Sequence, residues 1–263
     1  MRHIGLSLLF FACVAISSLA SAADSPGTVL ITGSSRGIGF AFATKYAETG
    51  WSVIATARDP DKSDQLKALA KAHKNVRLEK LDVTDLKSVD ALAAKLKGTP
   101  IDLLLNNAGI DPTPDKQIFG NIDYALFDEI MRTNVLGPIK VTEAFTPHVA
   151  ASKQKKMITI SSGDGSLSGV EKRPGKGAIF YRASKSALNM ALVNVAKDVA
   201  DKGITVVMLT PGVVATDMAA AAGPLPQAIT PEKSVGLLMP LIEKYTMENT
   251  GKFYRNTGDA VSW

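Results

Sequence analysis

The sequence predicts a doubly wound α/β fold, a single Rossmann-type domain in which helices cover both faces of a parallel sheet of about seven strands. From Thr28 onward, short apolar runs rich in β-branched residues alternate with longer segments of helical period. The short runs are apolar on both faces, as strands buried between two helix layers are. The chain of 263 residues is 46% hydrophobic, which is enough for a sizeable core, and no long linker divides it.

Each short apolar run predicts one strand of this sheet. The runs are TVLIT (28–32), SVIATA (52–57), NVRLEKL (75–81), IDLLL (101–105), MITIS (157–161), ITVVML (204–209) and GKFYR (251–255). Between them, helical periodicity predicts helices that begin near Ile38, Lys62, Leu86, Asp123, Asn134, Tyr181 and Pro231. Because such sheets bind ligands at the carboxyl ends of their strands, the residues that follow each strand are the candidates for a site.

The first 22 residues form a secretory signal pattern. A basic start and an apolar stretch over residues 4–19 precede Ala-Ser-Ala at 20–22, the small residues that a signal peptidase accepts. A transmembrane anchor is the competing interpretation, but serines interrupt the stretch, which is shorter than the ~20 apolar residues of a membrane span. We therefore expect a signal peptide at 1–22, a mature domain at 23–263 and export to the periplasm or a secretory compartment, with a cytoplasmic chain as the alternative.

Composition excludes several kinds of site. The single cysteine, Cys13, lies within the predicted signal, so the mature domain offers no disulfide, thiol nucleophile or thiolate metal site. His73 and His148 are far apart in sequence, and no metal site is expected. The net charge is +5, but basic and acidic residues are interspersed. This mild basicity suits an anionic small ligand, and no nucleic-acid partner is expected.

A glycine-rich turn, TGSSRGIG at 32–39, follows the first strand and leads into a helix. Gly33 allows a tight turn, Gly37 lets the backbone approach a pyrophosphate, and Gly39 lets the helix pack on the strand. The free amide donors of the helix start also favour phosphate. The spacing G-x-x-x-G-x-G differs from the G-x-G-x-x-G dinucleotide fingerprint, so a purely structural turn is the alternative.

The same residues fit a second motif, the nucleophile elbow of α/β-hydrolases, with Ser35 as the nucleophile. That chemistry needs a histidine in a loop after a late strand and a segment that forms an oxyanion hole. Only His73 and His148 follow Ser35, both on predicted helices, and no HGGG-type segment occurs. The sequence therefore disfavours the hydrolase.

Two arginines predict which dinucleotide is bound. An NAD site would carry an acidic residue near the end of the second strand to take the ribose hydroxyl. Arg58 stands there instead, and Arg36 in the glycine turn lies within reach of the same region. Since guanidinium groups suit bidentate contact with a 2′-phosphate, the pair predicts NADP(H), although either arginine alone would be an ordinary surface residue.

Tyr181 and Lys185 are four residues apart on a predicted helix and share one face of it. A phenol with its unperturbed pKa of about 10 is a poor proton donor or acceptor at neutral pH. A nearby ammonium group favours the phenolate, which makes Tyr181 a candidate acid/base. The alternative is a pair of ordinary helix-surface residues, because this spacing often arises by chance.

Seven motifs occur in order along the chain. They are TGSSRGIG (32–39), LDVTD (81–85), NNAG (106–109), TNVLGP (133–138), ISS (160–162), YRASK (181–185) and PGVVATDM (211–218). Together they resemble the short-chain dehydrogenase/reductase family, over essentially all of 28–263. The segment RASKSALNM and the ending GKFYRNTGDAVSW are most similar to the sniffer and C-factor carbonyl reductase subgroup.

The resemblance implies four catalytic residues. Tyr181 would give a proton to the carbonyl oxygen, while Lys185 would bind the nicotinamide ribose and lower the pKa of the phenol. Ser162 would hydrogen-bond the substrate oxygen, and Asn134 would hold the water of a proton relay. Because all four residue types are present, we expect an active enzyme.

The resemblance also implies a cofactor site and an assembly. Asp82 would contact the adenine, and Thr216 would meet the nicotinamide carboxamide. The family usually forms homodimers or homotetramers, here through the helices beginning at Asn134 and Tyr181. The implied cofactor-binding residues are Gly33, Ser35, Arg36, Gly37, Ile38, Gly39, Arg58, Asp82, Val83, Asn106, Ala108, Gly109, Tyr181, Lys185, Pro211, Gly212, Val214 and Thr216.

One departure from the family concerns the serine. Ser162 precedes Tyr181 by 19 residues, whereas Ser168 stands at the spacing common in the family. Ser162 is preferred because it ends an apolar strand, while Ser168 lies in a glycine-rich loop that absorbs an insertion. The loop is expected to form a lip over the substrate pocket.

Two segments bear on the substrate. Lys172, Arg173 and Lys176 in the inserted loop would favour an acidic substrate, and a solvated loop is the alternative. The segment AAAAGPLPQAIT (219–230) is small and apolar, which suggests a modest apolar carbonyl compound.

The expected activity is hydride transfer between NADPH and the carbonyl group of a small aldehyde or ketone, with Tyr181 as acid/base. The alternative is an exported protein that binds a dinucleotide or a partner and signals without turnover. After processing, no stable membrane span is expected.

Overall fold

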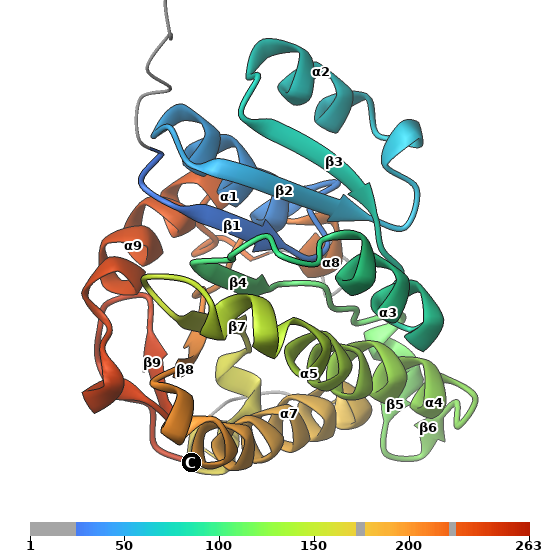
Figure 1. The fold of residues 1–263 in the computed structure, drawn as a ribbon. Helices are drawn as coiled ribbons and strands as arrows, with labels where there is room; N and C mark the ends of the chain where they lie inside the picture. Colours follow the sequence, from blue (N-terminus) through green and yellow to red (C-terminus); the bar gives the residue numbers. More distant parts are fainter. Residues whose placement is uncertain (1–24, 172–176, 221–224) are drawn as a thin grey trace, which may run out of the picture.

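The computed structural model describes residues 25–171, 177–220 and 225–263. Its sheet contains β1 (Thr28–Ile31), β2 (Ser52–Ala57), β3 (Val76–Lys80), β4 (Leu103–Asn106), β7 (Lys156–Ile160), β8 (Thr205–Thr210) and β9 (Lys252–Arg255). The strand order is β3-β2-β1-β4-β7-β8-β9, and each neighbouring pair is parallel (Figure 1). The predicted doubly wound fold is confirmed. Each of these seven strands begins and ends within two residues of the bounds of its predicted apolar run.

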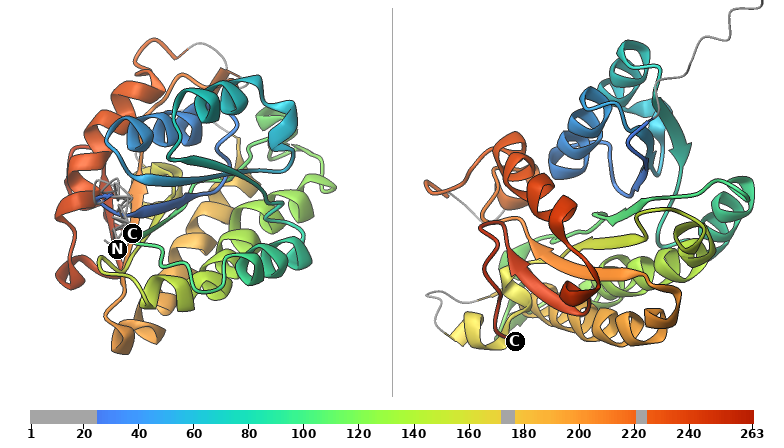
Figure 2. Two further views of the ribbon diagram at one scale, coloured as in Figure 1. Left: turned by 45° about the horizontal axis from the view of Figure 1, so that its top comes forward. Right: turned by 60° about the vertical axis from the view of Figure 1, so that its left-hand side comes forward.

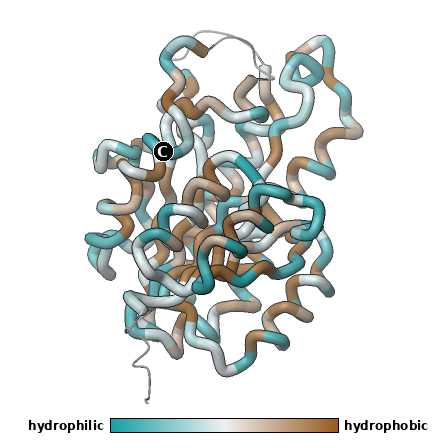
Figure 3. The backbone as a smooth tube through the Cα atoms, turned by 90° about the horizontal axis from the view of Figure 1, so that it is seen from above, coloured by the Kyte–Doolittle hydropathy of each residue, from teal (hydrophilic) through white to brown (hydrophobic). Residues whose placement is uncertain are grey.

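Helices cover both faces of the sheet (Figure 2). One face carries α1 (Gly37–Glu48), α2 (Asp64–Ala72) and α9 (Pro231–Lys244), and the other carries α3 (Leu86–Lys95), α5 (Gly137–Ala150) and α7 (Ile179–Asp198). Two apolar cores result, one on each side of the strands. Figure 3 shows hydrophobic segments in the middle of the molecule and hydrophilic ones mainly on its outer turns.

The side-chain alternation of each strand explains why its residues are apolar throughout. Val29 and Ile31 of β1 belong to the core beneath α1, whereas Leu30 between them belongs to the core beneath α5. All three are 0% exposed. Each strand therefore contributes to both cores, as parallel strands between two helix layers do.

The helices predicted to begin near Asp123 and Asn134 are present and begin three residues later, but the sequence did not indicate that they are continuous. In the structure, α4 (Leu126–Met131) continues through a π-helical turn (Arg132–Leu136) directly into α5, with the Gly137 N–H bonded to the Arg132 carbonyl. Pro138 gives the physical reason, because it has no N–H to donate to the carbonyl of Asn134 four residues earlier. The backbone accommodates the missing bond by widening one turn rather than by ending the helix.

Short elements fill the connections between the long ones. A 3-10 turn (Pro114–Lys116) leads into the hairpin of β5 (Gln117–Ile118) and β6 (Asn121–Ile122). A second 3-10 turn, η4 (Gly163–Gly165), and α6 (Leu167–Glu171) lie between β7 and α7, and α8 (Asp217–Ala220) follows β8. The remaining 3-10 turns are Pro60–Lys62, Ala200–Lys202 and Met247–Asn249.

Some predictions fall on residues outside the described ranges. These are the signal peptide at 1–22 and the three cations Lys172, Arg173 and Lys176. Within the ranges that the structure describes, none of the helices is long and apolar enough to cross a membrane. In the same part of the chain, histidine, cysteine and acidic side chains form no group that could hold a metal ion.

Candidate active site

The glycine turn between β1 and α1 is closely packed at Gly33 and Gly39. Gly33 and Gly37 have positive φ angles of 68° and 55°, which favour glycine. A Cβ on Gly33 would lie 2.9 Å from the Cα of Ala108. A Cβ on Gly39 would lie 2.2 Å from the Gly33 carbonyl oxygen and 2.4 Å from the amide nitrogen of Asn107. The turn is therefore a bare backbone surface, closed against the segment that follows β4.

Two side chains lock this turn to the end of β4. The Thr32 hydroxyl accepts hydrogen bonds from the backbone N–H groups of Asn107 and Ala108, both at 3.0 Å. In return, the Asn107 amide donates to the carbonyls of Thr32 (3.0 Å) and Gly33 (3.1 Å). The sequence analysis quoted Asn107 only within NNAG and assigned it no role. Its function is to hold two neighbouring strand ends together.

Asn106, the last residue of β4, is buried beside this lock. Its amide nitrogen donates to the Thr142 hydroxyl at 3.0 Å. Its amide oxygen, although buried, has no hydrogen-bond partner among the described residues. A buried acceptor without a donor is costly, so a donor from a bound molecule would stabilise this residue.

The two arginines lie on adjacent, exposed segments. Arg58 follows β2, and Arg36 precedes the first residue of α1. The Ser34 N–H donates to the Thr56 carbonyl at 2.8 Å, which holds the glycine turn against the end of β2. Arg36 also has a partner that the sequence did not predict, because its guanidinium lies 3.5 Å from the Asp217 carboxylate.

The residues after β3 form a compact turn. The Asp82 carboxylate accepts from the Thr84 N–H at 2.9 Å and from the Thr84 hydroxyl at 2.7 Å. Val83 is buried, and a Cβ on Gly137 would lie 3.0 Å from it. This turn therefore packs directly on the start of α5.

Asn134, in the π-helical turn, joins three parts of the site. Its amide oxygen accepts from the Ile110 N–H at 2.8 Å, and its nitrogen donates to the Ile110 carbonyl at 2.8 Å and to the Ser184 hydroxyl at 3.0 Å. The side chain is 0% exposed and is committed to these contacts. Pro138 cannot donate to the backbone carbonyl of Asn134, which makes that carbonyl the candidate for holding a water.

Tyr181 and Lys185 share one face of α7, with the Lys185 ammonium 5.7 Å from the centre of the Tyr181 ring. The ammonium donates to the Ile160 carbonyl at the end of β7 at 3.3 Å. Lys185 is 5% exposed, and its burial lowers its pKa to about 8, while the negative charge of Asp111 acts to raise it. The ordinary lysine pKa is about 10.4, so this group changes charge much nearer to neutral pH.

Ser162 lies between the end of β7 and η4. Its hydroxyl oxygen accepts from the Asp164 N–H at 3.2 Å, which leaves its own hydrogen for donation. The following turn is tied to α7, since the Gly165 carbonyl accepts from Ser186 at 3.2 Å and from Asn189 at 3.3 Å. Ser162 thus stands next to a segment fixed on the helix that carries Lys185.

Ser168 has a different environment. It lies in α6, where its N–H donates to the Trp263 carbonyl at 3.2 Å and its hydroxyl lies 3.4 Å from that of Ser166. These contacts connect it to the carboxyl-terminal residues rather than to a strand end. The two serines therefore belong to different local structures, since Ser162 lies two residues after β7 and Ser168 lies in α6.

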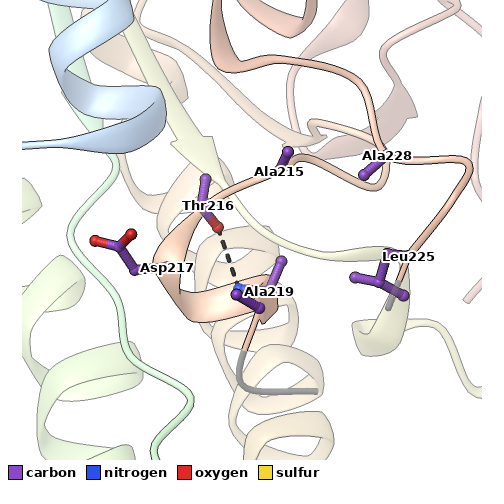
Figure 4. A pocket seen from close by; sticks show the side chains of 7 residues that line it. Ala215, Thr216, Asp217, Ala219, Leu225 and Ala228 are labelled. Atoms are coloured by element: carbon purple, nitrogen blue, oxygen red, sulfur yellow. Dashed lines mark hydrogen bonds between the residues drawn. The ribbon is translucent and has the colours of Figure 1, made fainter. Parts of the chain in front are cut away.

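A hollow of about 320 Å³ opens beside α8 (Figure 4). Gly37 adjoins it, since a Cβ there would lie 3.3 Å from the methyl group of Thr216. The Thr216 hydroxyl caps α8 by accepting from the Ala219 N–H at 3.2 Å (Figure 4). The described residues that line the hollow are Ala215, Thr216, Asp217, Ala219, Ala220, Leu225 and Ala228.

The Pro211-Gly212 turn holds the segment that leads to this hollow. The Pro211 carbonyl accepts from the Ser234 hydroxyl at 2.8 Å and from the Asn256 amide at 3.2 Å. Gly212 has a φ of 84°, and Val214 pairs with Ile229 as an isolated β-bridge. The predicted residues on this segment are thereby placed at the carboxyl end of β8.

Comparison with known proteins gives consistent similarities. A family model described as short chain dehydrogenase matches residues 27–225. An NADPH-bound carbonyl reductase from chicken fatty liver has a TM-score of 0.83 and 32% identity, covering 91% of this chain and 100% of its own. The carbonyl reductase Sniffer of D. melanogaster has a TM-score of 0.80 and 28% identity, covering 90% and 99%. The C-signal of Myxococcus xanthus is 34% identical over 173 residues, 66% of this chain and 99% of its own length.

The tight packing of Gly39 generates a prediction about stability. Gly39→Ala should lower the free energy of unfolding by about 1–3 kcal/mol, because its methyl group overlaps backbone and amide atoms. The matched control is Gly236→Ala in α9, where nothing lies within 4 Å of the new Cβ. That change should stabilise the protein by up to about 1 kcal/mol through helix propensity. Urea unfolding measures both, and equal midpoints for Gly39→Ala and the wild type would contradict the packing argument.

Proposed function

The chain belongs to the short chain dehydrogenase family, and on that premise we propose that it is an NADPH-dependent reductase of small aldehydes or ketones. The observation that supports this proposal most directly is the pair formed by Tyr181 and the buried Lys185. The pair lies at the edge of the sheet where the strands have their carboxyl ends, as the glycine turn does. The similarity to sniffer-type carbonyl reductases, which the motifs predicted, supports the same activity.

NADPH fits the bare surface of the glycine turn. The missing side chain at Gly37 would give a phosphate access to the backbone, while Gly33 lets the turn close on Ala108. The first turn of α1 offers unpaired N–H groups and contains no acidic residue that would repel an anion. The orphaned Asn106 oxygen provides an acceptor for a donor of the bound cofactor. When bound, the cofactor supplies the hydride that reduces the carbonyl carbon.

Arg58 and Arg36 would hold the 2′-phosphate. Both guanidinium groups are exposed and lie on segments that hydrogen bonds bring together. The contact of Arg36 with Asp217 does not oppose this role, because both side chains are more than 70% exposed and such surface pairs stabilise little. A phosphate carries more negative charge than one carboxylate and accepts bidentate hydrogen bonds. Arg36 would therefore exchange its partner when the cofactor binds.

The other cofactor contacts follow the family pattern. Asp82 and Val83 would border the adenine, and Asn106, Ala108 and Gly109 would line the nicotinamide side. The Pro211-Gly212 turn, Val214 and Thr216 would close the site from the end of β8. Ser35 and Ile38, in and after the glycine turn, complete the proposed set.

The protein's own groups carry the proton chemistry. Tyr181 donates a proton to the oxygen of the substrate carbonyl as its carbon is reduced. The charged form of Lys185 lowers the pKa of that phenol, which would otherwise be about 10. The Ser162 hydroxyl donates a hydrogen bond to the same substrate oxygen, and the backbone carbonyl of Asn134 holds a water that returns a proton. The alanine-rich hollow accommodates a small apolar substituent on the carbonyl.

Removal of the Tyr181 hydroxyl tests the mechanism. Tyr181→Phe should lower kcat for NADPH-dependent reduction of a panel of small aldehydes and ketones by about 100-fold or more, since no acid replaces the phenol. The dissociation constant of NADPH, measured by fluorescence, should stay within about two-fold of the wild-type value because the phenol supplies little of the cofactor contact. A Phe variant with wild-type turnover would exclude Tyr181 as the proton donor.

Cofactor preference is predicted to depend on Arg58. Arg58→Ala should weaken NADPH binding by about 10- to 100-fold, the cost of losing hydrogen bonds from a charged group, and leave NADH binding nearly unchanged. Lys97→Ala is the control, because it removes an exposed positive charge just after the carboxyl end of α3. Titration calorimetry with both cofactors makes the comparison. An unchanged NADPH/NADH ratio in Arg58→Ala would rule out the assignment of the phosphate site.

We also propose that the chain is exported after cleavage behind Ala22, as the signal pattern predicts. The intact mass of the protein in the envelope or secreted fraction of its native cells should then correspond to a chain that begins at Ala23. A full-length chain confined to the cytoplasmic fraction would overturn this proposal without affecting the proposed reaction.

A further inference from the structure

Gln117 links the reactive helix to the loop after β4, although no motif contains it. Its side chain is 0% exposed and lies in the short hairpin of β5 and β6. Its nitrogen donates to the Asp111 carboxylate at 3.0 Å and to the Pro112 carbonyl at 2.8 Å. Its oxygen accepts from the backbone N–H of Tyr181 at 2.9 Å. One buried amide thus joins Asp111 and Pro112 to Tyr181, which lies 64 residues beyond Gln117 in the sequence.

The bond to Tyr181 replaces a helix cap. The first N–H groups of a helix have no partner within the helix. Ala178, which precedes α7, has a left-handed φ of 54° and gives no side-chain cap. Gln117 supplies the missing acceptor from another element, at the residue whose side chain would donate the proton. The position of Tyr181 relative to the hairpin therefore depends on this amide.

The bond to Asp111 fixes a carboxylate on the segment that passes Lys185, since a Cβ on Gly109, two residues earlier, would lie 3.5 Å from the Lys185 ammonium nitrogen. Burial raises the pKa of Asp111, while the Gln117 hydrogen bond and the positive charges of Lys185 and Arg182 lower it. Among the described residues, those two cations on α7 are the charged groups that act on Asp111. Conversely, Asp111 is the charged group that opposes the loss of the proton from Lys185. Asn134 holds the preceding residue, Ile110, at both backbone groups, so the carboxylate is held from two sides.

We propose that Gln117 is a positioning residue that holds Tyr181 and the Asp111 carboxylate in one arrangement, and that Asp111 keeps the Lys185 ammonium charged beside the phenol. This inference rests on the proposed function, because it concerns the same proton-donating pair. The alternative is a purely structural role for Gln117. The hairpin that contains it packs closely on the start of α7, where a Cβ on Gly177 would lie 3.0 Å from Ile118. That role would change stability but not the protonation of Lys185.

Two substitutions separate charge from packing. Asp111→Asn removes the charge but keeps an oxygen that accepts from Gln117. Gln117→Glu keeps an acceptor for the Tyr181 N–H and, because two adjacent, at least partly buried carboxyl groups share one proton, it also keeps a hydrogen bond to Asp111 and a single negative charge. Asp111→Asn should therefore shift the proton equilibrium of Lys185, whereas Gln117→Glu should leave it nearly unchanged. Asn121→Ala is the matched control, because this exposed residue of the same hairpin donates only to the Asp115 carbonyl.

The primary measurement is the pH titration of Lys185 in the full-length protein. The Lys185 side-chain resonance is followed by NMR in ¹³C-lysine-labelled protein and assigned with Lys185→Met. The wild-type midpoint should lie near pH 8, and it should move to lower pH in Asp111→Asn and stay close to the wild-type value in Gln117→Glu. It should not move in Asn121→Ala. An unchanged midpoint in Asp111→Asn would overturn the inference, whether or not the protein reduces a carbonyl.

Turnover gives a second, independent test. Gln117→Met removes all three hydrogen bonds and should lower kcat for carbonyl reduction about ten-fold or more, because displacement of a reacting group by a fraction of an ångström is costly. The KM for NADPH should stay within about two-fold. In Asp111→Asn, kcat/KM should fall at lower pH than in the wild type, because the ammonium is lost earlier as the pH rises. Wild-type kcat in Gln117→Met would contradict the positioning role, and absence of any wild-type turnover would contradict only the proposed function.

Discussion

The three hydrogen bonds of the Asn134 side chain are the interaction on which the arrangement of the site depends. They join the loop after β4, the π-helical turn and α7 at one buried point. Without them, Ile110 would lose both of its backbone partners, and Ser184 would lose a contact one residue before Lys185. The loop after β4 would then be held to α7 mainly through the Gln117 amide and packing, although Lys185 would keep its hydrogen bond to the Ile160 carbonyl at the end of β7. A polar residue in a buried helix is usually unfavourable, but here every group of its amide is satisfied.

Local patterns were sufficient to predict the fold and the backbone features of the site. The sheet follows from strands such as β1, whose successive residues are apolar because each faces a different core. The glycine turn follows from positions where a Cβ has no space or the backbone needs a positive φ. Ser162, which was preferred over Ser168 because it follows an apolar strand, lies two residues after β7, and its catalytic role stays a prediction. These properties are encoded within a few neighbouring residues.

Contacts between distant segments could not be predicted in the same way. Gln117 and Tyr181 are 64 residues apart, and nothing in either neighbourhood indicates that one would cap the other. Asp217 was not expected beside Arg36 because the relation depends on how α8 folds back toward the glycine turn. The continuous helix through Asn134 was missed for a different reason. A proline usually ends a helix, and the sequence does not show that a π-helical turn absorbs it.

If the proposed reductase seats its substrate in the hollow beside α8, the lining of that hollow determines how the substrate range can evolve. Four of its lining residues, Ala215, Ala219, Ala220 and Ala228, already end at Cβ, so its width there is set by the course of the backbone. Almost every single substitution at these four positions adds atoms to the side chain and therefore makes the hollow narrower. Selection or engineering can therefore narrow this space in steps, one side chain at a time. Widening it requires a change in the length or path of the segment itself, which makes broader substrate acceptance the slower direction of change.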